Sequence, residues 1–214
     1  METLLDRVVL LLILSDVAFL GLARVRSGLA LLSLQAVLLS VLATASHSGA
    51  LTPRVLGIAA TGLVVRGILL PLLLHRASRE AGVEEEKHPL VGRAASLLLG
   101  LAMLGAAMAL GARLPLRMAP SLDLVVPAAL FTVLTGVFLI VARRKALTQC
   151  LGYLVLENGI YGFGMTAVGD VPALVELGVL LDAFVAVLVM AVAIYHIREE
   201  FDHLDTDQLD TLKG

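Results

Sequence analysis

The sequence predicts an all-α, polytopic membrane protein with about seven transmembrane helices, its N-terminus outside and its C-terminus in the cytoplasm. Of its 214 residues, 59% are hydrophobic and 16% are charged, whereas a soluble domain is about 45–50% apolar and about 25% charged. The mean hydropathy is +0.96, and the apolar residues gather in long runs. A soluble enzyme, a disordered chain and a disulfide scaffold are excluded, because no soluble interior accommodates so much apolar surface.

The transmembrane segments follow from length, because a helix needs about 20 mostly apolar residues to cross a hydrocarbon core. Seven runs qualify: 4–23, 29–46, 55–74, 94–112, 122–142, 146–168 and 173–195. Short breaks rich in Gly, Pro and basic residues separate most of these runs, as turn chemistry requires. The one sizeable loop is expected over 75–93.

These runs divide the chain into four parts. We expect a three-helix membrane segment with its cytoplasmic loop over 1–93, a linking fourth helix over 94–121, a second three-helix segment over 122–195 and an acidic cytoplasmic tail over 196–214. The first run is predicted to be a retained helix rather than a cleaved signal. Its polar start carries Glu2, Asp6 and Arg7, and so lacks the net positive charge of a signal peptide.

The basic residues predict the orientation of the helices. Counted over alternate sides of the predicted spans, 11 of the 16 Lys and Arg residues fall on one side and 4 on the other, while Arg66 lies within a span. Because basic residues concentrate on the cytoplasmic side of membrane proteins, the richer side is expected to be cytoplasmic. The cytoplasmic membrane of a prokaryote is the expected location.

The composition also limits which cofactors and ligands the chain can bind. A single cysteine, Cys150, can neither close an internal disulfide nor hold an iron–sulfur cluster. The five histidines lie at the ends of apolar runs or outside them, so no pair is placed to bind a haem at mid-membrane. The net charge of −2 gives no sign of nucleic-acid binding. We therefore expect no metal and no cofactor in this chain.

Four ionisable residues remain deep inside the predicted spans: Asp16, Arg66, Glu157 and Asp182. At about 1.5 Å of rise per residue, each lies roughly 14–18 Å from the outer end of its helix. An ionisable group at this depth costs at least about 2.5–3.5 kcal/mol on insertion scales, which makes each one a functional candidate. Their common depth predicts a lateral polar path near the midplane.

Each of these four residues has a structural and a functional interpretation. Arg66 and Asp16 form either a structural ion pair between the first and third helices or a pair that tunes a proton path. Glu157 and Asp182 are either structural carboxylates or proton-relay carboxylates; the relay is favoured, because a carboxyl group buried without an obligatory partner can gain and lose a proton.

Asn158 and Glu176 are weaker candidates. Asn158 follows Glu157 directly, in a segment flanked by glycines. Glu176 lies near the outer interface, where it is either an entry-site residue or a solvated carboxylate at the start of a helix.

Five segments carry a family resemblance: Arg143-Arg-Lys145, Gly152-Tyr-Leu-Val-Leu-Glu-Asn-Gly159, Pro172-Ala-Leu-Val-Glu-Leu-Gly178, Leu181-Asp-Ala-Phe184 and Asp210-Thr-Leu-Lys-Gly214. They resemble the hydrogenase-4 component E family, membrane subunits of group 4 nickel–iron hydrogenase and formate hydrogenlyase complexes. Upstream, Arg66-Gly-Ile-Leu-Leu-Pro71 is similar to a basic-residue-then-proline segment of that family's third helix.

The last three predicted helices also resemble the K subunit of respiratory complex I and the C subunit of multi-subunit cation/proton antiporters. In those proteins two membrane carboxylates serve the proton path. Asp182 matches the second of them, with Asp in place of the usual Glu. Glu157 is displaced by about one helical turn from the first, which keeps roughly the same helix face.

The resemblance implies an accessory, non-catalytic subunit that contributes to proton or cation translocation coupled to electron transfer on other chains. Its implied partners are antiporter-like and complex I-like membrane subunits and, through them, peripheral nickel–iron hydrogenase-type subunits. Two alternatives remain open. One is a stand-alone secondary transporter, although no convincing inverted repeat is visible in the sequence. The other is a structural scaffold between antiporter-like subunits.

Overall fold

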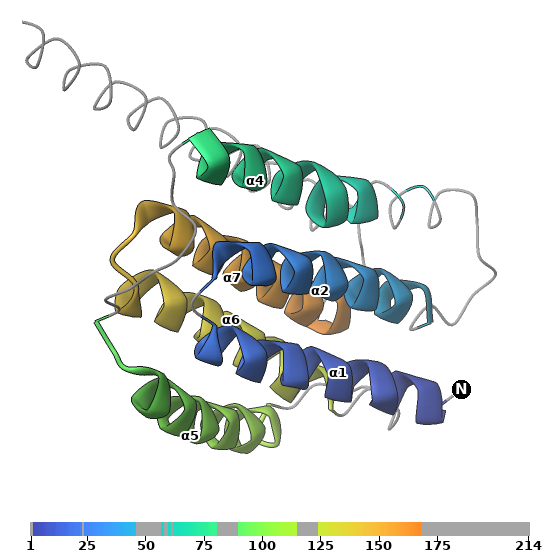
Figure 1. Cartoon of the computed structure of the whole chain (residues 1–214). Coiled ribbons are helices and arrows are strands. Elements are labelled where there is room, and N and C mark those ends of the chain that lie inside the picture. The colour runs from blue at the N-terminus through green and yellow to red at the C-terminus, as the bar shows by residue number, and fades with distance from the viewer. Residues whose placement is uncertain are drawn as a thin grey trace, which may run out of the picture.

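The computed structural model describes residues 2–22, 24–45, 57, 60, 62–80, 90–114 and 124–167. Every element in these ranges is helical (Figure 1). The elements are α1 (Glu2–Gly21), α2 (Val25–Ala45), the π-helical segment η1 (Val65–Leu69), α4 (Leu70–Glu80), α5 (Arg93–Gly111), α6 (Val125–Ala142) and α7 (Ala146–Ala167).

The all-α prediction is confirmed, and six of the seven predicted runs are helical where the structure describes them. Three helices, α2, α5 and α6, are long and apolar enough to cross a membrane among the described residues. The predicted run 173–195 and the tail 196–214 lie outside those residues. One predicted boundary is wrong: α4 continues to Glu80 rather than ending at 74. The apolar run ends at residue 74, but the polar residues that follow it remain helical as far as Glu80.

The antiparallel pair α6 and α7 forms the centre of the bundle, and three glycines bring the two backbones together. A Cβ atom on Gly159 would lie 2.5 Å from the backbone nitrogen of Val133, and one on Gly152 would lie 2.9 Å from that of Ile140. A Cβ atom on Gly136 would collide with the backbone of Leu156. The small residues of the run 146–168 predict close helix contact, and the glycines permit it here.

The other helices pack around this pair. Helices α1 and α2 lie against α6 and α7, respectively, α5 packs on α1 and α6, and α4 with η1 packs on α2. Figure 1 shows this order, with α4 and α5 at opposite edges of the described bundle. Much of α5 faces outward, and its Leu98 and Leu101 are 70% and 69% exposed. An apolar surface of this kind suits contact with lipid or another membrane subunit.

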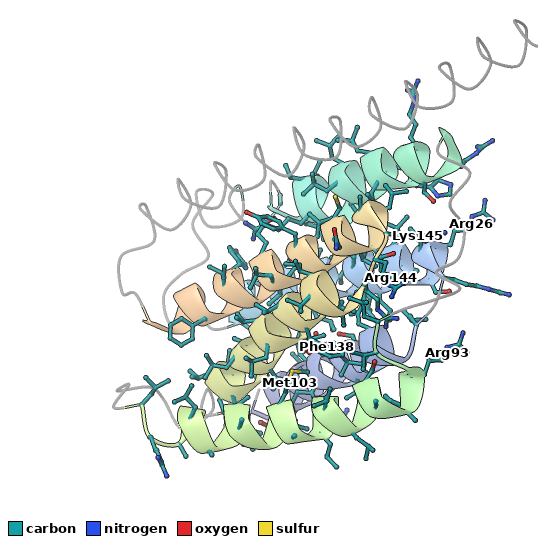
Figure 2. All side chains as sticks on the ribbon, turned by 90° about the vertical axis from the view of Figure 1, so that its left-hand side faces the viewer. Arg26, Arg93, Met103, Phe138, Arg144 and Lys145 are labelled. Carbon is teal, nitrogen blue, oxygen red and sulfur yellow. The ribbon has the colours of Figure 1, made fainter. Side chains whose placement is uncertain are left out.

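Basic residues from separate elements gather at one end of the bundle. Figure 2 shows Arg26 of α2, Arg93 of α5 and the linker residues Arg144 and Lys145 at this end. Their neighbour Arg143 is buried instead, and its Nη2 atom donates to the carbonyl oxygen of Leu20, 3.2 Å away, in the last turn of α1. A cation at a helix C-terminus satisfies a free carbonyl and complements the helix dipole.

Candidate functional site

The first part of the candidate site surrounds the carboxyl group of Asp16, which is completely buried. Gln35 of α2 donates from Nε2 to Asp16 Oδ1 across 2.7 Å. Thr132 of α6 donates from Oγ1 to Asp16 Oδ2, also across 2.7 Å. Short bonds of this kind satisfy a buried carboxylate, so Asp16 joins three helices at one point.

Gln35 extends this arrangement to α7. Its Nε2 atom also lies 3.1 Å from Ser15 Oγ, and its Oε1 atom accepts a hydrogen bond from Asn158 Nδ2 at 3.3 Å. An amide group has donors on one side and an acceptor on the other, and Gln35 uses both. We call Asp16, Gln35, Thr132 and Asn158 the Asp16 cluster.

The second part is an ion pair between η1 and α7. Arg66 Nε lies 3.2 Å from Glu157 Oε1, and both residues are buried, at 8% and 2% exposure. The guanidinium carbon of Arg66 lies 4.3 Å from the centroid of the Tyr161 ring, close enough for a cation–π contact. We call Arg66 and Glu157 the Arg66 pair; Glu157 precedes Asn158 of the Asp16 cluster directly in α7.

The backbone around Arg66 is a π-helical turn, and the nearby proline accounts for it. Pro71 has no N–H group to donate to the carbonyl of Gly67, and its ring crowds that carbonyl. The helix widens instead, and the N–H group of Leu70 donates to the carbonyl oxygen of Val65. Single π-helical turns of this kind are frequent at functional sites.

The structure gives Arg66 a different partner from the one considered in the sequence. Arg66 pairs with Glu157 rather than with Asp16, whose described partners are Gln35 and Thr132. The reason is placement: η1 packs on α2 and faces α7, whereas α1 lies on the other side of α2. The idea that Glu157 is buried without a partner is therefore wrong.

Three residues of the site were missed in the sequence. Gln35 offered a signal, because it is an amide at the middle of an apolar run and is the central residue of α2. Thr132 and Tyr161 offered none, since both residue types are ordinary in membrane helices. Asp182 and Glu176 lie outside the described residues. Within the described ranges, no three His, Cys, Asp or Glu side chains gather where they could hold a metal ion.

The first comparison with known proteins concerns the C-terminal part of the chain. The family model of NADH-ubiquinone/plastoquinone oxidoreductase chain 4L matches residues 124–214. The match includes α6 and α7, and therefore Thr132, Glu157, Asn158 and Tyr161. The C-terminal part of the chain is thus similar to chain 4L of these oxidoreductases. No solved structure is significantly similar to the chain.

Relatives over most of the chain then define the family. Hydrogenase-4 component E of Escherichia coli K12 is 32% identical over 180 residues, which cover 83% of this chain and 82% of the relative. The Shigella flexneri protein of the same name matches equally well. An uncharacterised protein of Mycobacterium tuberculosis is 36% identical over 153 residues, covering 71% of this chain and 69% of the relative. The chain belongs to the hydrogenase-4 component E family and is a multi-pass membrane protein.

Proposed function

We propose that this chain is an accessory membrane subunit of a hydrogenase-like or complex I-like complex and that its buried polar residues relay protons within the membrane. The observation that carries the proposal is that consecutive residues of α7 belong to the two groups, since Glu157 pairs with Arg66 and Asn158 donates to Gln35. Polar side chains from α1, α2, η1, α6 and α7 thereby form one layer across the bundle. Buried ionisable groups are expensive in a membrane and accompany proton pathways.

The Asp16 cluster has the hydrogen-bonding capacity that a proton carrier needs. The Thr132 hydroxyl lies 2.7 Å from Asp16 Oδ2 and 3.0 Å from the carbonyl oxygen of Ala128. A hydroxyl has one hydrogen and two lone pairs. It donates to Asp16 when the carboxylate is ionised, and it donates to Ala128 and accepts from Asp16 when the carboxyl group is protonated. Both charge states are satisfied without moving a heavy atom.

The Arg66 pair supplies the fixed charge beside this carrier. The Arg66 guanidinium always carries a positive charge, and it pairs with Glu157, the residue that precedes Asn158 in α7. Asp182 is the second relay carboxylate of the proposal, as the family resemblance implies, with Glu176 at the outer entry. The seven spans, the external N-terminus and the cytoplasmic C-terminus belong to the same proposal.

The relay is tested in the whole complex, reconstituted into vesicles and supplied with its redox substrates. Proton uptake per electron is measured for two near-isosteric changes: Asp16→Asn removes the protonatable carrier, and Glu157→Gln removes the carboxylate that pairs with Arg66 beside it. Cys150→Ala is the matched control, because Cys150 is buried in the same helix as Glu157 and belongs to neither polar group. Proton uptake per electron should fall strongly in both variants and stay unchanged in the control. Unchanged uptake in both acidic-residue variants would refute the relay.

The orientation is tested separately, in the Cys150→Ala chain. Arg93→Cys places a thiol at the basic end of the bundle, and Arg113→Cys places one at the far end of α5. A membrane-impermeant maleimide added from outside should label position 113 and spare position 93 until the membrane is opened. The opposite labelling pattern would reverse the proposed orientation.

The scaffold alternative has one observation in its favour, because an ion pair such as Arg66–Glu157 also serves a purely structural role. A scaffold would lose stability in these variants, but the complex that still assembles would translocate protons normally. The proton-to-electron ratio therefore separates the two functions, since it is independent of how much complex is present.

A further inference from the structure

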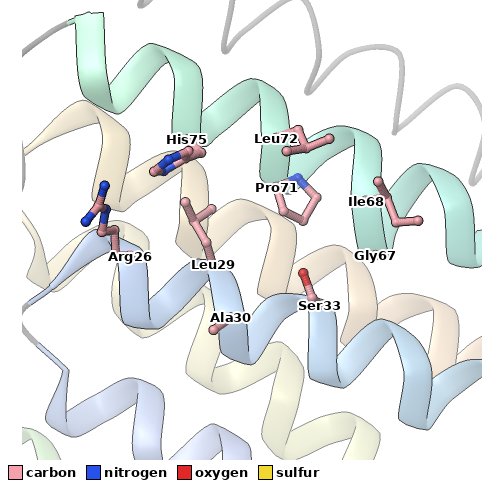
Figure 3. Close-up of a pocket in the computed structure, with 9 residues that line it drawn as sticks. All are labelled: Arg26, Leu29, Ala30, Ser33, Gly67, Ile68, Pro71, Leu72 and His75. Atoms are coloured by element: carbon pink, nitrogen blue, oxygen red, sulfur yellow. The ribbon is translucent and has the colours of Figure 1, made fainter.

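A groove of about 480 Å³ runs between α2 and the continuous helix formed by η1 and α4. This volume is within the range of about 300–1,000 Å³ found for ligand sites. Figure 3 shows the groove walls, with Leu29 and Ala30 on α2 facing Ile68, Pro71 and Leu72 on the other helix. Ile68 and Leu72 are more than half exposed. The groove is therefore an apolar surface open along its length.

The two ends of the groove differ in chemistry. Arg26 and His75 lie together at one end, while Ser33 and Gly67 lie toward the other (Figure 3). Arg26 belongs to the basic end of the bundle (Figure 2), and Arg76 and Arg79 follow His75 in the last turns of α4. The charged end of the groove thus coincides with the end of the bundle that carries most basic residues.

We propose that this groove binds one anionic phospholipid. An acyl chain lies along Leu29, Ile68 and Leu72, and the phosphate group contacts Arg26 and His75. The guanidinium of Arg26 supplies positive charge and directed donors for phosphate oxygens, and the His75 ring supplies a further donor. An acyl chain fits the apolar walls of a groove that opens toward the membrane.

Charge complementarity favours this occupant over a zwitterionic lipid or a protein helix. Basic pockets between transmembrane helices, at the level of the head groups, are sites for anionic lipids. A protein helix would use the apolar walls equally well, but it would meet the Arg26 guanidinium with a counter-charge only if it carried an acidic residue at that end of the groove. Every anionic phospholipid carries a phosphate there. The assignment is independent of the proton relay, because neither polar group of the relay lines the groove.

The absence of tryptophan from the sequence allows a direct test in the purified full chain. Leu72→Trp places the single fluorophore in the groove, and Leu98→Trp places one on the exposed face of α5, close to the same end of the bundle. Each variant is reconstituted with phosphatidylcholine and phosphatidylglycerol, of which only one carries brominated chains. Quenching by each brominated lipid gives the relative affinity of the site for the anionic lipid.

Leu72→Trp should prefer phosphatidylglycerol by about fivefold, the effect of roughly one basic residue near a lipid head group, and Leu98→Trp should show a ratio near one. Arg26→Gln with His75→Gln should abolish the preference, while Arg26→Lys should keep it. The Leu98→Trp form of each variant checks that the bundle still inserts normally. The proposal is overturned by equal quenching at position 72, by a preference that survives the double change, or by a position 72 that neither lipid quenches, as a covering protein segment would produce.

Discussion

The two parts of the buried polar layer hold a carboxylate in different ways. Glu157 faces the permanent charge of Arg66, whereas Asp16 is bound by the neutral donors Gln35 and Thr132. Protonating Glu157 would leave the Arg66 guanidinium without this counter-charge. Protonating Asp16 requires only that the Thr132 hydroxyl turn toward Ala128. The two carboxyl groups therefore differ because their neighbours differ in charge. Glu157 is held in its ionised form, whereas Asp16 can be ionised or protonated.

The largest expected effect is on stability, when the Arg66 pair loses one partner. Glu157→Gln should lower the free energy of unfolding by about 3–5 kcal/mol, because it leaves a buried guanidinium without this counter-charge. Combining it with Arg66→Gln should restore part of that loss, since no buried charge then remains in the pair. Thermal unfolding of the purified chain in detergent measures both variants. If the loss of stability in the double variant equals the sum of the losses in the two single variants, Arg66 and Glu157 do not stabilise the fold as a pair.

The next largest effect should come from Gln35, which joins Asp16 of α1 to Asn158 of α7 within the Asp16 cluster. Gln35→Leu removes the donor to Asp16 and the acceptor for Asn158. Each buried polar group left without its partner costs about 1–3 kcal/mol, so the free energy of unfolding should fall by about 2 kcal/mol or more. Gln35→Glu, which retains the acceptor, is the informative companion. A neutral result for Gln35→Leu would contradict the two hydrogen bonds that place Gln35 at the centre of the Asp16 cluster.

Thr132→Val should have a smaller effect on stability. It keeps the shape of the side chain but removes one hydrogen bond to a carboxyl group, which is worth about 1.5–3 kcal/mol when the acceptor is charged. In the background of Asp16→Asn the same change should cost less, because the charged acceptor is gone. A double-mutant cycle measures this difference, and strict additivity would contradict the contact between Thr132 and Asp16.

The smallest expected change in stability belongs to Asp16→Asn, at about 1 kcal/mol or less. The asparagine carbonyl still accepts from Gln35, and its amide donates to Thr132, whose hydroxyl can bond Ala128 instead. Proton uptake by the complex should nevertheless fall, since the amide takes up no proton. Asp16→Asn should thus lower proton uptake with little loss of stability, whereas Glu157→Gln should lower both. A large loss of stability in Asp16→Asn would remove this contrast.

Sequence reasoning located most of the fold, because membrane helices follow from the length of apolar runs. The runs at 94–112 and 146–168 agree closely with α5 and α7. The third run was extended in the structure to Glu80, because hydropathy marks the edge of the apolar segment and not the end of the helix. The glycines at 152 and 159 predicted close packing, and α6 is the helix they contact.

The candidate site was only partly predictable. Asp16, Arg66 and Glu157 stood out because a charge is rare inside an apolar run, whatever its surroundings. Gln35 carries weaker polarity, and Thr132 and Tyr161 resemble many other residues in membrane helices. Their importance comes from position, since each lies beside a charged group that belongs to another helix.

The sequence by itself determined that this is a helical membrane protein and which of its residues are too polar for their depth, because the cost of burying each group is local. Only the tertiary structure decided the partners. Helix packing directs Arg66 to Glu157 and leaves Asp16 to Gln35 and Thr132. Pairing depends on which helix faces which, and that choice is made by side-chain packing over the whole bundle, such as the glycine contacts of α6 with α7.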